Sequence, residues 1–279
     1  MDIKFYDVTE FLRELERKEF PPFSGNYSTY SRLCLGDIVS DDMRKILYID
    51  SDTMIEDNIS ELYDSNVESK ICLGVWDTIA EDYYTQIGLP ADFMYVNAGI
   101  LLINLPEWKK FFSEEELREL VALPLLDMPD QNMINAALFK TGAKDYVVHP
   151  RYNVLAFFQD WNLDSLRKIL PDFVSKYYSI EELREALTHP AIIHLGRTMR
   201  GRPWYKGNTH PFTAKWMNYL KETGFYADFE PFEAPKVALS FKIKAWLNSI
   251  FPQSFVVFVR GLYFLPRTLH KKLKKILGR

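Results

Sequence analysis

Two aspartates, Asp50 and Asp52, follow the short apolar segment 45–49. Residues two apart in an extended chain point to the same side, so both carboxylates can face one hard cation. Such a pair can hold Mg²⁺ or Mn²⁺ and leave coordination positions open for phosphate oxygens. Alternatively, Asp52 only caps the turn that follows. The position directly after an apolar strand favours the metal interpretation.

His194 ends a second apolar segment, 191–194, and leads into a loop rich in cations and glycines: Gly196, Arg197, Arg200, Gly201, Arg202, Lys206 and Gly207. Flexible backbone beside guanidinium groups suits a diphosphate. A lone histidine is more often a structural residue, and a basic loop can simply be solvated. We therefore regard His194 as a candidate metal ligand and the loop as a candidate anion site.

Asp130 and Gln131 stand at the start of a predicted helix that ends at Gly142. Its apolar pairs Met133/Ala137 and Ile134/Leu138 are four residues apart, which is helical spacing. We expect Asp130 to lie just before the helix, where it could be only an N-cap. A Gln in the next position is a weak nucleophile but a good hydrogen-bonding group for a sugar.

The elements that would position these residues alternate between apolar strands and helices. Strands are predicted near residues 3–5 and at 45–49, 71–76, 96–104 and 191–194, with a helix over 8–19. Continuous apolar strands separated by helices indicate an α/β fold with a largely parallel sheet covered on both faces. Asp50, Asp52, Asp77 and His194 would then lie beyond carboxyl ends of strands, where such sheets bind ligands.

Charge divides the 279 residues into an acidic body and a basic tail. Residues 236–279 contain ten of the 34 Lys and Arg and none of the 38 Asp and Glu, so residues 1–235 contain 24 basic and 38 acidic residues. Leu269, Leu273, Ile276 and Leu277 recur at helical spacing among lysines. This predicts an amphipathic helix that binds an anionic membrane surface without spanning it. The alternative is that the basic helix docks on the acidic body. Binding to nucleic acid is disfavoured, because the helix has more apolar residues than a segment that only contacts phosphates needs.

Composition is typical of a soluble globular protein, with 47% apolar and 26% charged residues. Cys34 and Cys72 cannot form a disulfide framework, and no second pair exists for a metal knuckle. The first residues do not resemble a secretory signal, and no apolar run is long enough to span a membrane. We expect a cytoplasmic protein, peripheral on the inner face of the cell membrane.

Several ordered segments together resemble glycosyltransferase family 8, which includes bacterial lipooligosaccharide galactosyltransferases. They are Tyr30–Leu33 (YSRL), Ile49–Asp52 (IDSD), Tyr95–Leu105 (YVNAGILLINL), Asp130-Gln131 with Asn135, and His194 followed by Arg202-Pro203-Trp204. The segment 95–105 is the most specific match. The resemblance covers nearly the whole chain.

The resemblance implies an A-type, Rossmann-like transferase that moves a hexose, with retention, from a UDP-sugar to a glycan or lipid-linked acceptor with Mn²⁺ or Mg²⁺. Asp50, Asp52 and His194 would bind the metal. Gly201 and Arg202 would meet the diphosphate. The donor sugar would be positioned by Arg32, Asp77, Asn97 and Asp130, with Gln131 beneath the anomeric carbon and Asp130 and Gln131 as the catalytic pair. The domain would span 1–235 and the membrane-associating tail 236–279.

The resemblance further implies that Met1 corresponds to a point well inside the family domain, past the strands that bind uracil and ribose. We therefore expect an N-terminally truncated chain of weak stability. Two other functions stay open. A truncated relative could only bind, without activity. Residues 46–53 also fit the DxDxT motif of haloacid-dehalogenase-like phosphatases, although the later acidic motif that such enzymes need is not found downstream.

Overall fold

A computed structural model of the chain describes most of the predicted body. The described residues are 2–77, 87–113, 116–117, 128–155 and 178–235, without 24, 41, 91, 197 and 199, together with the isolated positions 85, 158, 163, 164, 243 and 246. The predicted amphipathic helix of the tail and Arg197 lie outside these residues.

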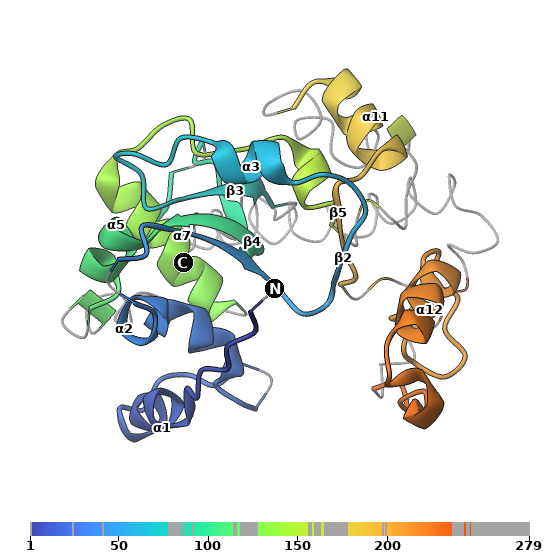
Figure 1. The fold of residues 1–279 in the computed structure, drawn as a ribbon. Coiled ribbons are helices and arrows are strands. Elements are labelled where there is room, and N and C mark those ends of the chain that lie inside the picture. The colour runs from blue at the N-terminus through green and yellow to red at the C-terminus, as the bar shows by residue number, and fades with distance from the viewer. Residues whose placement is uncertain are drawn as a thin grey trace, which may run out of the picture.

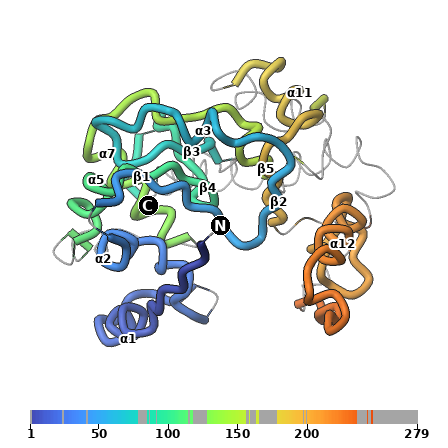
Figure 2. The backbone as a smooth tube through the Cα atoms, viewed as in Figure 1, coloured from blue at the N-terminus to red at the C-terminus, as the bar shows by residue number. Residues whose placement is uncertain are grey.

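The main sheet has three described strands in the order β1-β4-β3 (Figures 1 and 2). They are β1 (Lys45–Ile49), β3 (Cys72–Trp76) and β4 (Val96–Asn104). The segments were predicted correctly, but β4 runs antiparallel to both neighbours, so the expected largely parallel sheet is wrong for the described strands. An apolar run reports burial on both faces of a strand, and burial does not fix its direction.

The antiparallel direction of β4 still allows the polar residues that follow β1 and β3 to lie at the same edge of the sheet, as predicted. Since β1 and β3 are both antiparallel to β4, they run the same way, and their carboxyl ends meet at one edge of the sheet. The amino end of β4 lies at that same edge. Backbone hydrogen bonds fix this arrangement: Asp50 N donates to Gly99 O at 2.7 Å and Asp77 N to Tyr95 O at 2.8 Å.

A second, two-stranded sheet brings in the histidine. It pairs β2 (Thr53–Ile55) with β5 (Ile192–His194) in antiparallel register, with Thr53 opposite His194. Because β2 starts directly after Asp52, this register places His194 beside the two aspartates.

Helices cover both faces of the main sheet. α7 (Pro129–Thr141) lies against β4, with α1 (Thr9–Arg17), the 3₁₀ helix η1 (Ser28–Cys34), α2 (Leu35–Ile38) and α5 (Leu105–Phe111) on the same side (Figure 1). Their apolar residues form one core with β3 and β4. A second core on the other face includes α3 (Ser60–Asp64), η2 (Pro150–Tyr152) and α11 (Ile180–Thr188). The last described elements are α12 (Thr213–Glu222) and η3 (Tyr226–Asp228).

Two further expectations at element ends are corrected. The predicted first strand is absent: residues 2–8 have no regular structure, and Phe5 is 94% exposed, because no described strand lies alongside to pair with it. Asp130 does not precede its helix, since α7 begins at Pro129, a residue favoured in the first helical position. The C-terminal prediction is confirmed, with Gly142 closing α7 at φ 62°.

Candidate functional site

The aspartate pair and the histidine come together at the edge where β1 and β2 meet β5. One ligand atom from each of Asp50, Asp52 and His194 lies within 4.8 Å of the other two. His194 Nε2 is 3.2 Å from Asp52 Oδ1 and 4.0 Å from Asp50 Oδ2. Two carboxylates and an imidazole are a ligand set that suits Mn²⁺ or Mg²⁺.

The hydrogen-bond network behind His194 determines what its Nε2 faces. Asn97 Oδ1 accepts the Gly99 N–H at 2.9 Å, while Asn97 Nδ2 donates to Asp77 Oδ2 at 2.8 Å. The amide nitrogen of Asn153 must therefore be the group that donates to Asn97 Oδ1, at 2.9 Å. This leaves Asn153 Oδ1 facing His194 Nδ1 at 3.1 Å, so Nδ1 is the donor.

With its proton on Nδ1, a neutral His194 points the lone pair of Nε2 at the carboxylate of Asp52. Such an arrangement is repulsive unless a proton or a metal cation lies between the two atoms. An outer amide that fixes the tautomer is the usual support of a metal-binding histidine. The donor set and its support therefore fit a divalent cation held by Asp50, Asp52 and His194.

Gly99 gives the imidazole its space. A Cβ built on Gly99 would lie 2.3 Å from His194 Cε1 and 2.8 Å from His194 Nδ1. Any side chain at this position would push the ring out of its present place.

Arg202 joins the cluster from the basic loop. Its Nη1 donates to Asp52 Oδ2 at 2.7 Å, and its guanidinium lies 5.3 Å from the centre of the Trp204 ring. Burial alone would raise the pKa of Asp52, but a His194 that is also protonated on Nε2, through its hydrogen bond and its charge, and the charge of Arg202 lower this pKa to about 2. Asp52 is therefore a carboxylate at neutral pH. Gly201, next to Arg202, has a φ of 86° in a turn closed by Thr198.

Arg32 connects Asp50 with Asp130. Its Nη2 donates to Asp50 Oδ1 at 3.1 Å, and its Nε lies 3.2 Å from Asp130 Oδ2. Burial by itself lowers the pKa of Arg32, but Asp130, Tyr48 and Asp50 reverse this, so the guanidinium stays charged. Burial raises the pKa of Asp130, and the charge of Arg32 opposes that rise.

Gln131 lies in the first turn of α7, and both the oxygen and the nitrogen of its side-chain amide form hydrogen bonds. Its Oε1 accepts the Ala98 N–H at 2.9 Å, and its Nε2 donates to Asp77 Oδ2 at 2.9 Å. Arg32 Nη1 donates to Ala98 O at 2.5 Å, so the two polar groups meet at the same residue of β4. All the predicted site residues thus belong to one connected cluster or, for Gly201, adjoin it.

Two residues that hydrogen-bond to the candidate site were not predicted from the sequence. Asn153 is 0% exposed and links His194 to Asn97, and Tyr48 donates its hydroxyl to Asp50 Oδ1 at 2.7 Å. Tyr48 lies two residues before Asp50 on the same face of the strand, which was a usable signal. Asn153 follows a 3₁₀ turn far from any predicted motif, and its contacts arise only in the folded chain.

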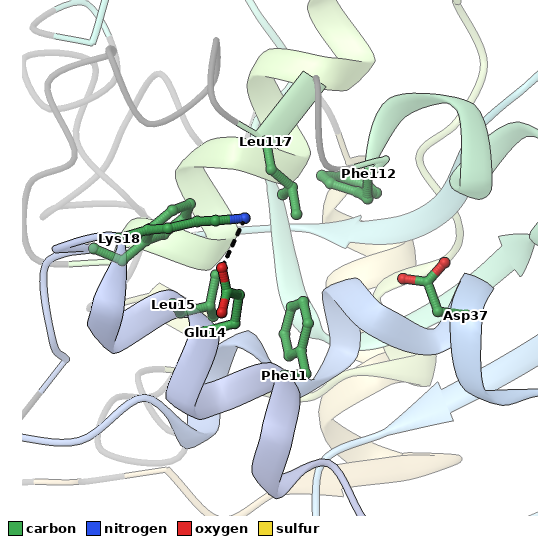
Figure 3. Close-up of a pocket in the computed structure, with 8 residues that line it drawn as sticks. Phe11, Glu14, Leu15, Lys18, Asp37, Phe112 and Leu117 are labelled. Carbon is green, nitrogen blue, oxygen red and sulfur yellow. Dashed lines mark ion pairs between the residues drawn. The ribbon is translucent and has the colours of Figure 1, made fainter.

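A cavity of about 170 Å³ lies away from this cluster, beside α1 (Figure 3). Its lining is mostly apolar, with the Lys18–Glu14 ion pair at one side: Phe11, Glu14, Leu15, Lys18, Phe20, Asp37, Phe112 and Leu117. None of these residues belongs to the candidate site. Within the described ranges, no helix is both long enough and apolar enough to cross a bilayer.

The fold resembles that of solved glycosyltransferases. The galactosyltransferase LgtC, in complex with donor and acceptor sugar analogs, superposes with a TM-score of 0.52 at 20% identity over 82% of this chain and 75% of LgtC. The bifunctional glycosyltransferase WbbM gives a TM-score of 0.53 at 20% identity over 73% of this chain and 37% of WbbM. Identities this low support a shared fold and nothing finer.

The chain is also similar in sequence to curated proteins. General stress protein A of Bacillus subtilis is 24% identical over 201 residues, which cover 70% of this chain and 65% of the relative. Lipopolysaccharide 1,3-galactosyltransferase of Salmonella typhimurium is 34% identical over 110 residues, or 36% of this chain and 32% of the relative. The chain thus spans less than two thirds of either relative.

The sequence model described as glycosyl transferase family 8 matches residues 4–206, well over half of the chain and including every candidate site residue. This match takes away the support for the phosphatase interpretation of residues 46–53. The chain belongs to glycosyl transferase family 8.

Proposed function

We propose that the chain is a retaining hexosyltransferase that takes a hexose from a UDP-sugar to a glycan or lipid-linked acceptor. The observation that carries the proposal is the junction of the Asp50/Asp52/His194 cluster with the largely buried network of Arg32, Asp77, Asn97, Asp130 and Gln131. A cation-binding group beside a cluster of sugar-type hydrogen-bonding residues suits a nucleotide-sugar. The family and the names of the relatives support the same class.

Asp50, Asp52 and His194 would hold Mn²⁺ or Mg²⁺, which when bound neutralises charge on the donor diphosphate. Breaking the bond between hexose and phosphate leaves additional negative charge on the leaving diphosphate. Arg202, which is hydrogen-bonded to Asp52, is suited to meet that charge, because a guanidinium binds phosphate through paired N–H groups. The Gly201 turn would let the backbone approach it closely.

The donor sugar would be oriented by Arg32, Asp77, Asn97 and Asp130, which are held rigidly by one another. The oxygen of Gln131 already accepts a backbone hydrogen bond. Gln131 is therefore better suited to hydrogen-bond the sugar near its anomeric carbon than to attack it. This agrees with retention through attack by the acceptor on the face from which the diphosphate leaves.

The test is release of UDP from UDP-galactose and UDP-glucose in the presence of Mn²⁺, with and without lipooligosaccharide as acceptor. Galactose is tried first because the Salmonella relative is named a galactosyltransferase. We expect acceptor-stimulated UDP release, an α-linked product by NMR, and a loss of roughly 100-fold in Arg202→Ala, the scale for removing one donor aimed at developing charge.

Two outcomes would contradict the proposal. UDP binding without release of hexose from any UDP-sugar would indicate a binding-only relative. Phosphate release from p-nitrophenyl phosphate that is lost in Asp50→Asn would revive the phosphatase interpretation.

A further inference from the structure

His210 is a buried polar residue that has no role in the proposed reaction as described above. It lies between the basic loop and α12, with 3% of its surface exposed. Its backbone N–H donates to Asn208 Oδ1 at 3.1 Å, and its carbonyl accepts the Thr213 N–H at 3.1 Å. These bonds fix the residue between Asn208 and the first turn of α12.

The ring of His210 has one satisfied nitrogen and one unsatisfied nitrogen. Nδ1 accepts the Phe212 N–H at 3.2 Å, so the proton of the neutral ring is on Nε2. Nε2 is buried and has no hydrogen-bond partner among the described residues. A buried donor without an acceptor is costly, and in a native protein it calls for a physical reason.

The surroundings of His210 are cationic. Burial first, and then the charges of Arg200 and Arg202, lower the pKa of His210 to about 4. The ring is therefore neutral at physiological pH and offers an N–H without adding a third positive charge. Two guanidiniums and an N–H donor are complementary to an anion with several acceptor oxygens.

The same segment is tied to the candidate metal site. Thr209 N donates to Arg200 O at 3.0 Å, which holds the residues around His210 against the turn that carries Arg202. Asn208 donates to Pro203 O at 2.9 Å and to Tyr205 O at 2.8 Å. Arg202 itself reaches Asp52. His210 is thus part of the structure that presents Arg202.

We infer that the Nε2–H of His210 binds an oxygen of the donor diphosphate together with Arg202, which makes His210 a further binding residue of the transferase site. The inference rests on the proposed function for the identity of the anion. Nε2 is covered in the present arrangement, so the segment must rearrange to admit a phosphate. Gly201 and Gly207, at φ 86° and 67°, are backbone positions at which it can do so.

The probe is inorganic pyrophosphate with Mg²⁺, titrated by calorimetry into the full chain. His210→Leu removes the donor at similar volume, and His210→Gln restores an N–H at a similar reach. His189→Gln, at an exposed histidine, is the matched control. We expect His210→Leu to weaken pyrophosphate binding about 10-fold, the loss for one hydrogen bond to a charged group. The Gln variant and the control should stay near the wild type.

Equal affinity in the wild type and His210→Leu would overturn the inference, as would equally weak binding in the Leu and Gln variants or no binding by the wild type. If the Leu variant does not fold, the imidazole ¹H–¹⁵N spectrum of the wild type decides. The Nε2–H resonance must shift on addition of pyrophosphate, and an unchanged resonance overturns the inference. UDP release from UDP-sugars is measured separately. If the chain releases UDP but His210→Leu binds pyrophosphate as tightly as the wild type, only this inference is refuted and the proposed function stands.

Discussion

Gly99 shows how a single residue type can decide the geometry of the candidate site. It is the residue of β4 against which the His194 ring packs, and a Cβ there would come within 2.3 Å of that ring. We predict that Gly99→Ala folds but binds Mn²⁺ about 10-fold more weakly or worse, the scale for disturbing the support of a metal ligand. Electron paramagnetic resonance titration of free Mn²⁺ measures this directly.

The matched control is Gly224→Ala, where a Cβ meets nothing within 4 Å and φ is not in the left-handed region. It should bind Mn²⁺ as the wild type does. Unchanged Mn²⁺ affinity in Gly99→Ala would show that the position of the His194 ring is not needed for the metal.

Residue types and spacing were sufficient to select Asp50, Asp52 and His194 as metal candidates, because each lies at or just after the end of an apolar strand. The donor-sugar candidates were inferred from the family resemblance. Residue types and spacing were not sufficient for Asn153, whose bonds to Asn97 and His194 join segments far apart in the sequence. Nor could they show that Gln131 has both ends of its amide engaged. Such pairings depend on tertiary structure alone.

At the scale of elements, the strand segments were predictable and their directions were not. Apolar runs at 45–49 and 96–104 correspond residue for residue to β1 and β4. Strand direction depends on which strands become neighbours, and the sequence of one strand does not contain that information. The ends of β1 and β3 still meet at one edge of the sheet, as expected, since both strands run antiparallel to β4. The strand predicted near residues 3–5 is wrong for a related reason. Alternating apolar and polar residues do not form a strand when no neighbouring strand pairs with them.

Asn135 attaches α7 to the sheet, and its removal tests that connection. Its Oδ1 accepts Val96 N at 2.8 Å, and its Nδ2 donates to Val96 O at 2.9 Å, with the side chain 0% exposed. Asn135→Leu leaves two buried backbone groups unpaired, so we predict a loss of about 3 kcal/mol in the free energy of unfolding. Urea unfolding followed by circular dichroism measures it.

Asn218→Leu, at an exposed position of α12, is the control and should change stability by about 0.5 kcal/mol or less. A similar small effect in Asn135→Leu would mean that α7 is held to β4 by apolar packing alone.

At the scale of the whole molecule, the separation of charge is the dominant feature. An acidic body of 24 basic and 38 acidic residues precedes a segment, 236–279, with ten basic residues and no acidic ones. We predict that the full chain cosediments with phosphatidylglycerol vesicles and not with phosphatidylcholine vesicles, and that salt releases it. Each basic residue near an anionic surface contributes about 1 kcal/mol.

Replacement of Lys271, Lys272, Lys274 and Lys275 by Glu should abolish the cosedimentation. If the wild type ignores anionic vesicles at low salt, the basic segment does not bind membranes, and docking on the acidic body is the better account.

The central claim is that Asp50, Asp52 and His194 bind a metal that in turn binds a nucleotide diphosphate. Calorimetric titration of the full chain with UDP, with and without Mn²⁺, tests it most directly, with Asp52→Asn as the companion variant. The account predicts binding that requires Mn²⁺ and is lost in Asp52→Asn. UDP binding of equal strength without metal, or in the variant, would contradict it, and so would a folded wild type that does not bind UDP at all.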